Sequence, residues 1–316
     1  MAAEPVLLLV YNRLDTLKRV WDVLRRVKPR ILFISADGPK SAPEDVLRTE
    51  AVRKFVQSQI DWPCDAYFNF LSENEGCKRA VSGGITWFFS HVKAGIILED
   101  DTLPHPSFFT YMHEMLARYA DDSRVGMVSG TQLQPGFSQL SSGWDFIRIP
   151  FIWGWGTWQR VWSTYQAEPV GWEELKDSAL LENRVGSLRS YVRFLWKAMA
   201  GVTSGAIDTW DYQLSYLLLR EGQLCVIPEQ NLVRNLGHAH PLATHTRKGN
   251  WTSYLPLQRW RKGKGPLCMQ PNTAYERHLM LPHTLAGRIR ARLQYYRFRW
   301  GLQQQLVDDP FDEVGI

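Results

Sequence analysis

Three consecutive carboxylates, Glu99, Asp100 and Asp101, follow the apolar run GIIL at residues 95–98. Carboxylates at the end of a buried strand repel one another and lose hydration, so they need a cation or hydrogen-bond donors beside them. A divalent metal is the simplest remedy, because oxygen ligands suit Mg²⁺ or Mn²⁺ and phosphate oxygens commonly complete the shell of such an ion. The alternative is that Asp100 and Asp101 cap the helix expected near Ser107 or begin a solvated turn. The position behind a buried run favours the metal site.

A second pair of carboxylates lies in DTWDYQL, residues 208–214, at the start of an apolar helix. Asp208 is placed to be the N-cap of that helix, where its side chain would accept a backbone hydrogen bond. Asp211 lies in the first turn, so it either complements the helix dipole or serves a reaction.

Tryptophan and glycine alternate in PFIWGWGTWQRVW, residues 150–162. Sugar rings stack on aromatic faces, and glycine lets a bulky ligand approach the backbone, so Trp153, Gly154 and Trp155 are candidate sugar contacts. Core or lid packing is the alternative for the tryptophans. The segment NLGHAHPLATHT, 235–246, brings three histidines together, and we expect it to form a lid in which His238 or His240 is a candidate contact to metal or diphosphate.

Hydrophobic periodicity predicts an alternation of strands and helices that positions these residues. The order βαβαβαβα predicts an α/β fold with a mostly parallel sheet covered by helices on both faces, and ligands bind such sheets beyond the carboxyl ends of the strands. The expected strands are 6–11, 31–35, 65–70, 95–98 and 223–228. One helix is expected to begin near Asp15, and three more to span 43–59, 77–91 and 107–119. Two or three further helices are expected between 171 and 220.

Composition is that of a globular chain: 316 residues, 45% hydrophobic, with a net charge of +5. No run approaches the roughly 20 apolar residues of a membrane span, and the first residues lack the pattern of a signal peptide, so we expect a cytoplasmic protein. Residues 285–300 interleave arginine with apolar side chains. This pattern is typical of a basic helix at the inner face of a membrane, and equally of a solvated helix packed on the domain.

Several motifs occur in an order that resembles GT-A fold glycosyltransferases, in particular N-acetylglucosaminyltransferase I and related bacterial sugar transferases. The resemblance spans roughly residues 5–250, and the ordered set is more specific than the acidic motif alone. The motifs are PVLLLVYNR, FISADGPK, ENEGCKRAV, IILEDDTLPHPSFFTYM, PFIWGWGTW, DTWDYQLSY and CVIPEQNLVRNLG.

The resemblance implies a role for each motif. Asp101 would bind the metal, Mn²⁺ or Mg²⁺, while Asp100 would lie against the ribose or sugar of the donor and Glu99 would support the loop. Asp211 would be the general base that takes the proton from the acceptor hydroxyl, with inversion at the anomeric carbon. The donor nucleotide would be bound by residues at the ends of the early strands and near the third helix, namely Asn12, Arg13, Asp37 as the uracil contact, Asn74 and Lys78, and its sugar by Trp153, Gly154 and Trp155.

The resemblance also implies an organisation. Residues 1–130 would form a Rossmann-like half that binds the nucleotide sugar, 131–250 an acceptor and catalytic half of the same domain, and 251–316 a basic helical extension. The expected partners are a UDP-sugar such as UDP-N-acetylglucosamine and a glycan or lipid-linked glycan acceptor, with contact to a membrane surface through the basic extension.

Two other classes of protein share part of this pattern. A sugar nucleotidyltransferase would share the sheet and the metal carboxylates, but it normally carries a glycine-rich phosphate loop where this chain has VYNRLD. A nucleic-acid-binding protein would use the arginines and tryptophans, but it would leave the acidic triplet unexplained. The sequence therefore favours a glycosyltransferase that binds no nucleic acid.

Overall fold

The computed structural model describes residues 4–134, 136–175, 188–238, 240–242, 252 and 255–280. The basic segment at 285–300 and the histidine at 245 lie outside the described residues. Within the described part, no helix is long and apolar enough to cross a membrane.

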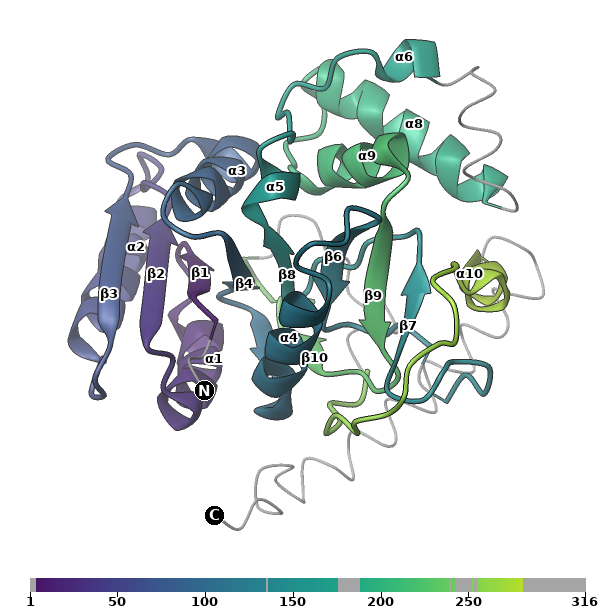
Figure 1. Ribbon diagram of the computed structural model, residues 1–316. Coiled ribbons are helices and arrows are strands. Elements are labelled where there is room, and N and C mark those ends of the chain that lie inside the picture. Colours follow the sequence, from purple (N-terminus) through teal and green to yellow (C-terminus); the bar gives the residue numbers. More distant parts are fainter. Residues whose placement is uncertain are drawn as a thin grey trace.

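A sheet of eight strands forms the centre of the molecule, in the order β3-β2-β1-β4-β8-β6-β9-β7 (Figure 1). The pairs β3–β2, β2–β1, β1–β4 and β6–β9 are parallel, whereas β8 is antiparallel to both β4 and β6, and β7 is antiparallel to β9. Six strands therefore run in one direction, and the predicted mostly parallel sheet is confirmed. The strands are β1 (Val6–Val10), β2 (Ile31–Ala36), β3 (Asp65–Phe70), β4 (Ala94–Glu99), β6 (Val125–Ser129), β7 (Trp144–Ile147), β8 (Trp155–Trp158) and β9 (Leu224–Pro228).

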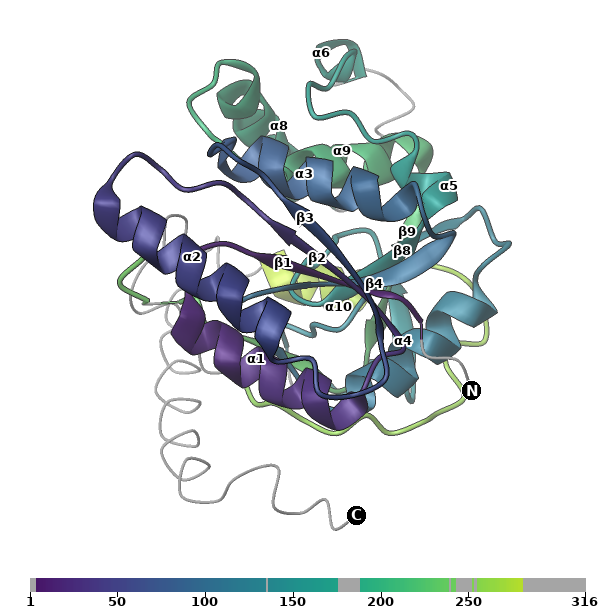
Figure 2. The same ribbon diagram turned by 90° about the vertical axis from the view of Figure 1, so that its left-hand side faces the viewer.

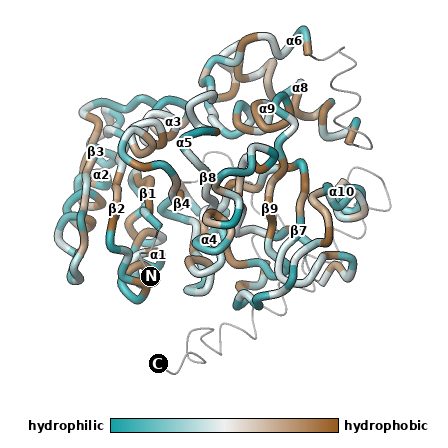
Figure 3. The backbone as a smooth tube through the Cα atoms, in the orientation of Figure 1, coloured by the Kyte–Doolittle hydropathy of each residue, from teal (hydrophilic) through white to brown (hydrophobic). Residues whose placement is uncertain are grey.

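Helices cover both faces of this sheet, with α1, α2 and α4 on one face and α3, α8 and α9 on the other (Figure 2). Hydrophobic colour follows strands such as β2 and β9 in Figure 3, because strands covered on both faces bury nearly every side chain. The helices are α1 (Leu14–Val27), α2 (Pro43–Ser58), α3 (Gly76–Phe89), α4 (Ser107–Arg118), α5 (Gln159–Trp162), α6 (Trp172–Leu175), α8 (Arg189–Thr203), α9 (Asp211–Glu221) and α10 (Thr273–Met280).

A second sheet, of two strands, begins directly after the acidic motif in the sequence. In it β5 (Thr102–Pro104) pairs antiparallel with β10 (Val233–Asn235), so that Thr102 lies opposite Asn235. The pattern in the sequence did not predict this sheet, nor the antiparallel strands β7 and β8. These strands have only three or four residues each, and so short a segment shows no periodicity.

Candidate functional site

The three early motifs meet at one edge of the sheet because β1, β2 and β4 are neighbouring parallel strands. Tyr11 to Arg13 follow β1, Asp37 follows β2, and Asp100 and Asp101 follow β4. Residues up to 90 positions apart thus gather beyond the carboxyl ends of the strands, which is where ligands bind open α/β sheets.

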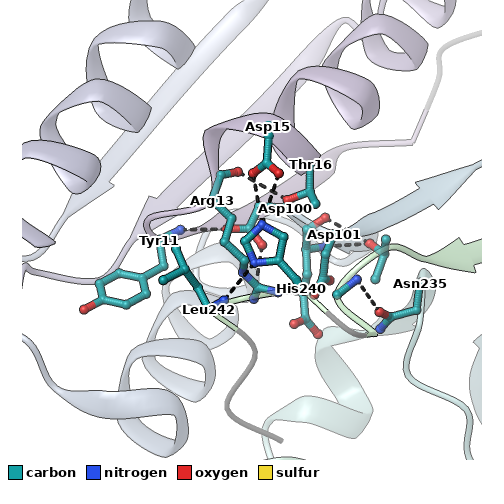
Figure 4. A network of polar contacts seen from close by, with 12 residues as sticks. Tyr11, Arg13, Asp15, Thr16, Asp100, Asp101, Asn235, His240 and Leu242 are labelled. Carbon is teal, nitrogen blue, oxygen red and sulfur yellow. Dashed lines mark hydrogen bonds and ion pairs between the residues drawn. The ribbon is translucent and has the colours of Figure 1, made fainter. Parts of the chain in front are cut away.

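Arg13 lies between the two aspartates of the acidic motif (Figure 4). Its Nη2 is 3.3 Å from Oδ1 of Asp100 and its Nη1 is 2.5 Å from Oδ2 of Asp101, while the backbone N–H of Tyr11 donates to Oδ2 of Asp100 at 3.1 Å. Asp100 and Asp101 are 2% and 6% exposed. A guanidinium therefore supplies positive charge to both carboxylates of the acidic motif within the chain itself.

The pKa values at this site reflect burial and mutual charge. Burial raises the pKa of Asp100 above its usual range, while Arg13 opposes the shift. Burial, followed by the charge of Asp101, likewise raises the pKa of Glu99. Burial alone would lower the pKa of Arg13, but the carboxylates around it outweigh that effect and raise it. Arg13 is therefore held as a cation inside the acidic motif.

One oxygen of Asp101 remains without a partner. Oδ1 is buried and accepts no hydrogen bond within the described part of the chain, whereas Oδ2 is paired with Arg13. No group of three or more histidine, cysteine, aspartate or glutamate side chains that could hold a metal ion occurs among the described residues. A carboxylate oxygen of this kind fits a cation that takes its other ligands from water and phosphate, as Mg²⁺ commonly does.

The segment after β10 packs over the acidic motif (Figure 4). The N–H of Leu236 donates to the backbone oxygen of Asp101 at 2.7 Å, and His240 Nε2 lies 3.1 Å from Oδ2 of Asp15 on α1. Gly237 has no room for a side chain, because a Cβ there would lie 2.1 Å from Oδ2 of Asp101. The histidine segment therefore contacts both the acidic motif after β4 and helix α1.

His238 is the histidine next to Asp101, whereas His240 faces Asp15. The ring of His238 packs edge-on against Trp153 at 5.1 Å between centroids, and Nε2 of His238 lies 3.3 Å from Oγ1 of Thr252. Its Nδ1 is buried without a hydrogen-bond partner in the described residues. Burial lowers the pKa of His238, which favours the neutral ring whose nitrogen is able to bind a cation.

Asp37 is fully engaged by the chain itself. Its Oδ1 accepts the N–H groups of Gly38 at 2.8 Å and Glu75 at 2.9 Å, and its Oδ2 accepts Nδ2 of Asn74 at 2.8 Å and the N–H of Gly76 at 3.2 Å. A carboxylate has about four lone-pair sites. Asp37 and Asn74 thus bind each other in this structure, and four donors of the chain itself already occupy the carboxylate of Asp37.

The N-terminus of α3 is also capped from elsewhere in the chain. Asp208 accepts the N–H groups of Cys77 at 2.8 Å and Lys78 at 3.0 Å, so it does not cap α9 as expected, since Trp210 is the N-cap residue there. The ammonium of Lys78 pairs with Glu168. Because these N–H groups and Lys78 already have acidic partners, the start of α3 is not an open anion site.

Asn12 faces the start of α2. Its Nδ2 donates to Oδ1 of Asp45 at 2.6 Å, and Tyr11 Oη and the N–H of Lys40 donate to Oδ2 at 2.5 and 2.7 Å. Asp45 therefore anchors the turn after β1 to the loop after β2. This residue was not singled out from the sequence, where an aspartate in the first turn of a helix is an ordinary dipole partner.

Asp211 is the first residue of α9 and accepts a hydrogen bond from Oγ1 of Thr209. Burial, and after it neighbouring carboxylates that include Asp211, raises the pKa values of Glu99 and Cys77. The charge of Asp211 thus acts on Glu99 at the end of β4, although the two lie more than 100 positions apart in the sequence.

The tryptophan segment divides between the site and the core. Trp155 is fully buried in β8 and stacks on Trp210 at 5.5 Å, so its ring offers no face to a ligand in this structure. Gly154 adopts a positive φ of 61° and lies against Val233, where a Cβ would be 2.7 Å from a methyl group. Trp153 is only partly buried and lies beside His238.

Comparison with known proteins adds little to this geometry. No family model matches the chain, and no curated protein matches it. Among solved structures, 4-diphosphocytidyl-2C-methyl-D-erythritol synthase from Anaerococcus prevotii is 9% identical with a TM-score of 0.32, covering 51% of this chain and 74% of its own. HddC from Yersinia pseudotuberculosis, complexed with GMP-PN, is 10% identical with a TM-score of 0.31, covering 51% and 80%.

These likenesses are too weak to carry an argument about activity. They also give no support to the resemblance to N-acetylglucosaminyltransferase I, which rests on the sequence motifs alone.

Proposed function

We propose that the chain is a metal-dependent glycosyltransferase that moves a sugar from a nucleoside diphosphate donor, such as a UDP-sugar, to a hydroxyl group of a glycan. The observation that supports the proposal is the buried Oδ1 of Asp101, which has no hydrogen-bond partner within the described part of the chain and belongs to a carboxylate paired with Arg13. Asp101 would hold a cation at the diphosphate, and Asp211, the first residue of α9, would act on the acceptor.

The proposal assigns the cation to Asp101. A bound Mn²⁺ or Mg²⁺ would neutralise the diphosphate and act as a Lewis acid while the glycosidic bond breaks. Oδ1 of Asp101 would hold it, with Nδ1 of His238 as a second ligand, since both atoms are buried and lack a partner in the described part. Arg13 pairs with both Asp100 and Asp101, and it would add positive charge at the position where the leaving diphosphate would gather negative charge.

Asp211 would accept the proton of the attacking hydroxyl. It lies at the start of α9, where Thr209 orients its carboxylate. The histidine segment over the acidic motif would keep water away from the donor, and Trp153 would pack against the transferred sugar.

A sugar nucleotidyltransferase is the second candidate, because a metal held by Asp101 beside Arg13 would serve a nucleoside triphosphate equally well. The names of the matched structures fit this candidate, although their TM-scores are too low to support it. The two reactions differ in their nucleophile: a sugar phosphate is already an anion, whereas a glycan hydroxyl needs a base. A carboxylate at the position of Asp211 favours the glycosyltransferase.

The test is to incubate the chain with a panel of nucleotide sugars and glycan acceptors, with and without Mn²⁺, and to measure the products. Release of nucleoside diphosphate that needs the metal, and that Asp211→Asn abolishes while donor binding persists, is the expected result. Formation of pyrophosphate from a nucleoside triphosphate and a sugar phosphate would establish the nucleotidyltransferase instead.

A further inference from the structure

Arg234 lies in the middle of β10, opposite Leu103 of β5. Side chains alternate between the two faces of a strand, so Arg234 points away from the side on which Val233 packs against Gly154. The helix α1 packs on β5, the partner strand of β10, and carries Arg19 at an exposed position. The two arginines come from segments more than 200 positions apart.

The side chain of Arg234 is mostly buried. The residue is 8% exposed, and among the described residues its side chain donates one hydrogen bond, from Nε to the backbone oxygen of Leu255 at 3.2 Å. No carboxylate lies within 4.0 Å of it in the described part of the chain. Burial, and then the charge of Arg19, lowers the pKa of Arg234 to about 10, so the side chain still carries its charge at neutral pH.

Two other well-buried arginines show what is missing at Arg234. Arg148 is paired with Glu276, whose side chain is fully buried, at 2.5 Å. Arg13 is paired with both aspartates of the acidic motif. At Arg234 the neighbouring charge is instead a second arginine, which repels it.

A buried charge without a counter-ion loses hydration and gains nothing in return, and a like charge beside it adds to the loss. A planar guanidinium with no acidic partner in the described part of the chain matches an oxyanion, to which it can donate two parallel hydrogen bonds. An anion between the two arginines would offset both the lost hydration and the repulsion.

We propose that Arg234 and Arg19 form a binding site for a phosphate group at the junction of β10 and α1, separate from the carboxylate site at Asp101 and Asp211. The ligand is either inorganic phosphate or the phosphate of a phospholipid headgroup. The chemistry of the site is the same for both, and the experiment separates them.

The first measurement is the thermal unfolding temperature during titration with inorganic phosphate, against sodium chloride of equal ionic strength and with EDTA present. We expect a saturable rise for the wild type. Arg234→Gln and Arg19→Ala should each weaken the response about tenfold or more, since each removes charged hydrogen-bond donors. Asp101→Asn, at the other site, and the exposed control Arg124→Gln should retain it.

A second variant protects the test if Arg234→Gln is poorly folded. Without phosphate, Arg234→Met should unfold at the same temperature as the wild type or a higher one, because it removes an uncompensated charge and keeps the packing volume. Co-sedimentation with phosphatidylcholine vesicles, with and without phosphatidic acid, then identifies the source: binding only to the acidic vesicles assigns the site to a headgroup, and a phosphate response without vesicle binding assigns it to the free ion.

The proposal is overturned if phosphate raises the unfolding temperature no more than chloride does, or if Arg234→Gln and Arg19→Ala respond like the wild type. A clear fall in the unfolding temperature of Arg234→Met without phosphate would also overturn it, because it would show that the charge is already compensated within the chain.

Discussion

The carboxylate of Asp208 accepts a hydrogen bond of 2.8 Å from the backbone N–H of Cys77, which lies 131 positions earlier in the chain. The same carboxylate accepts the N–H of Lys78, so one side chain satisfies two free donors at the start of α3. Asp208 precedes α9 by three residues. Its contact therefore holds the segment that carries Asp211 against the start of α3.

Removing this contact should affect both stability and transfer. For Asp208→Ala we expect a loss of about 1–2 kcal/mol in the free energy of unfolding, as for other helix caps, together with a lower kcat because Asp211 is less well held. Asp208→Asn keeps one acceptor oxygen and should recover much of both. Denaturant unfolding and steady-state kinetics measure the two effects, with the exposed Asp121→Ala as control. An unchanged kcat in Asp208→Ala would show that the helix cap formed by Asp208 does not affect the reaction.

Asp37→Asn distinguishes a structural role from base recognition. An amide in place of the carboxylate directs its NH₂ group at donors, so at least two of the four hydrogen bonds to residues 38 and 74–76 are lost. We expect a fall of about 1–3 kcal/mol in unfolding free energy and little change in the preference among nucleotide bases. Urea unfolding and competition by UDP, CDP and GDP test this. A stable variant that has lost its preference for one base would assign Asp37 to the base instead.

Gly237→Ala tests the close approach of the histidine segment to the acidic motif. The added Cβ would lie 2.1 Å from Oδ2 of Asp101 and 2.9 Å from Nη1 of Arg13, so one of these groups must move. A displacement of that size at the reacting centre is expected to reduce kcat/KM about 100-fold. Gly83→Ala on α3 is the matched control, because a Cβ there meets nothing within 4 Å. Equal kcat/KM values in the two variants would contradict the assignment.

Asp45 should govern part of the stability at acidic pH. Burial would raise its pKa, but the hydrogen bonds from Tyr11, Lys40 and Asn12 outweigh burial and lower it. The stabilisation is thus fully present above the ordinary carboxyl pKa and is lost as the pH falls through the lowered value. Between about pH 4 and pH 2, the free energy of unfolding should fall more steeply in the wild type than in Asp45→Asn. Parallel curves would show that Asp45 has an unshifted pKa.

The alternation of strands and helices was predictable, because buried parallel strands such as β1 and β4 appear in the sequence as continuous apolar runs. The placement of Asp101 at the end of β4 followed from the same pattern. The three-residue strand β10 and the strand β8 carry no such signal, and Trp155, which looks like a ligand contact in the sequence, is buried because it belongs to β8.

The partners of the site residues were not predictable. Arg13 and Asp101 pair across 88 positions, and the sequence around either residue does not indicate the other as its partner. The same holds for Asp208, whose position before an apolar helix indicates a local cap although its carboxylate serves a different helix. The local pattern indicates which strand a residue follows. Which side chains from other strands lie beside it depends on the order of the strands in the sheet, and one sequence does not specify that order.

The central claim is that Asp101 binds a divalent cation together with a nucleoside diphosphate. Calorimetric titration of UDP into the chain, with and without Mn²⁺, tests it most directly in the wild type, Asp101→Asn and the control Asp121→Asn. The account predicts that Mn²⁺ strengthens UDP binding to the wild type and to Asp121→Asn, and that Asp101→Asn loses this gain. UDP affinity that is independent of Mn²⁺, or a gain that survives in Asp101→Asn, would contradict it.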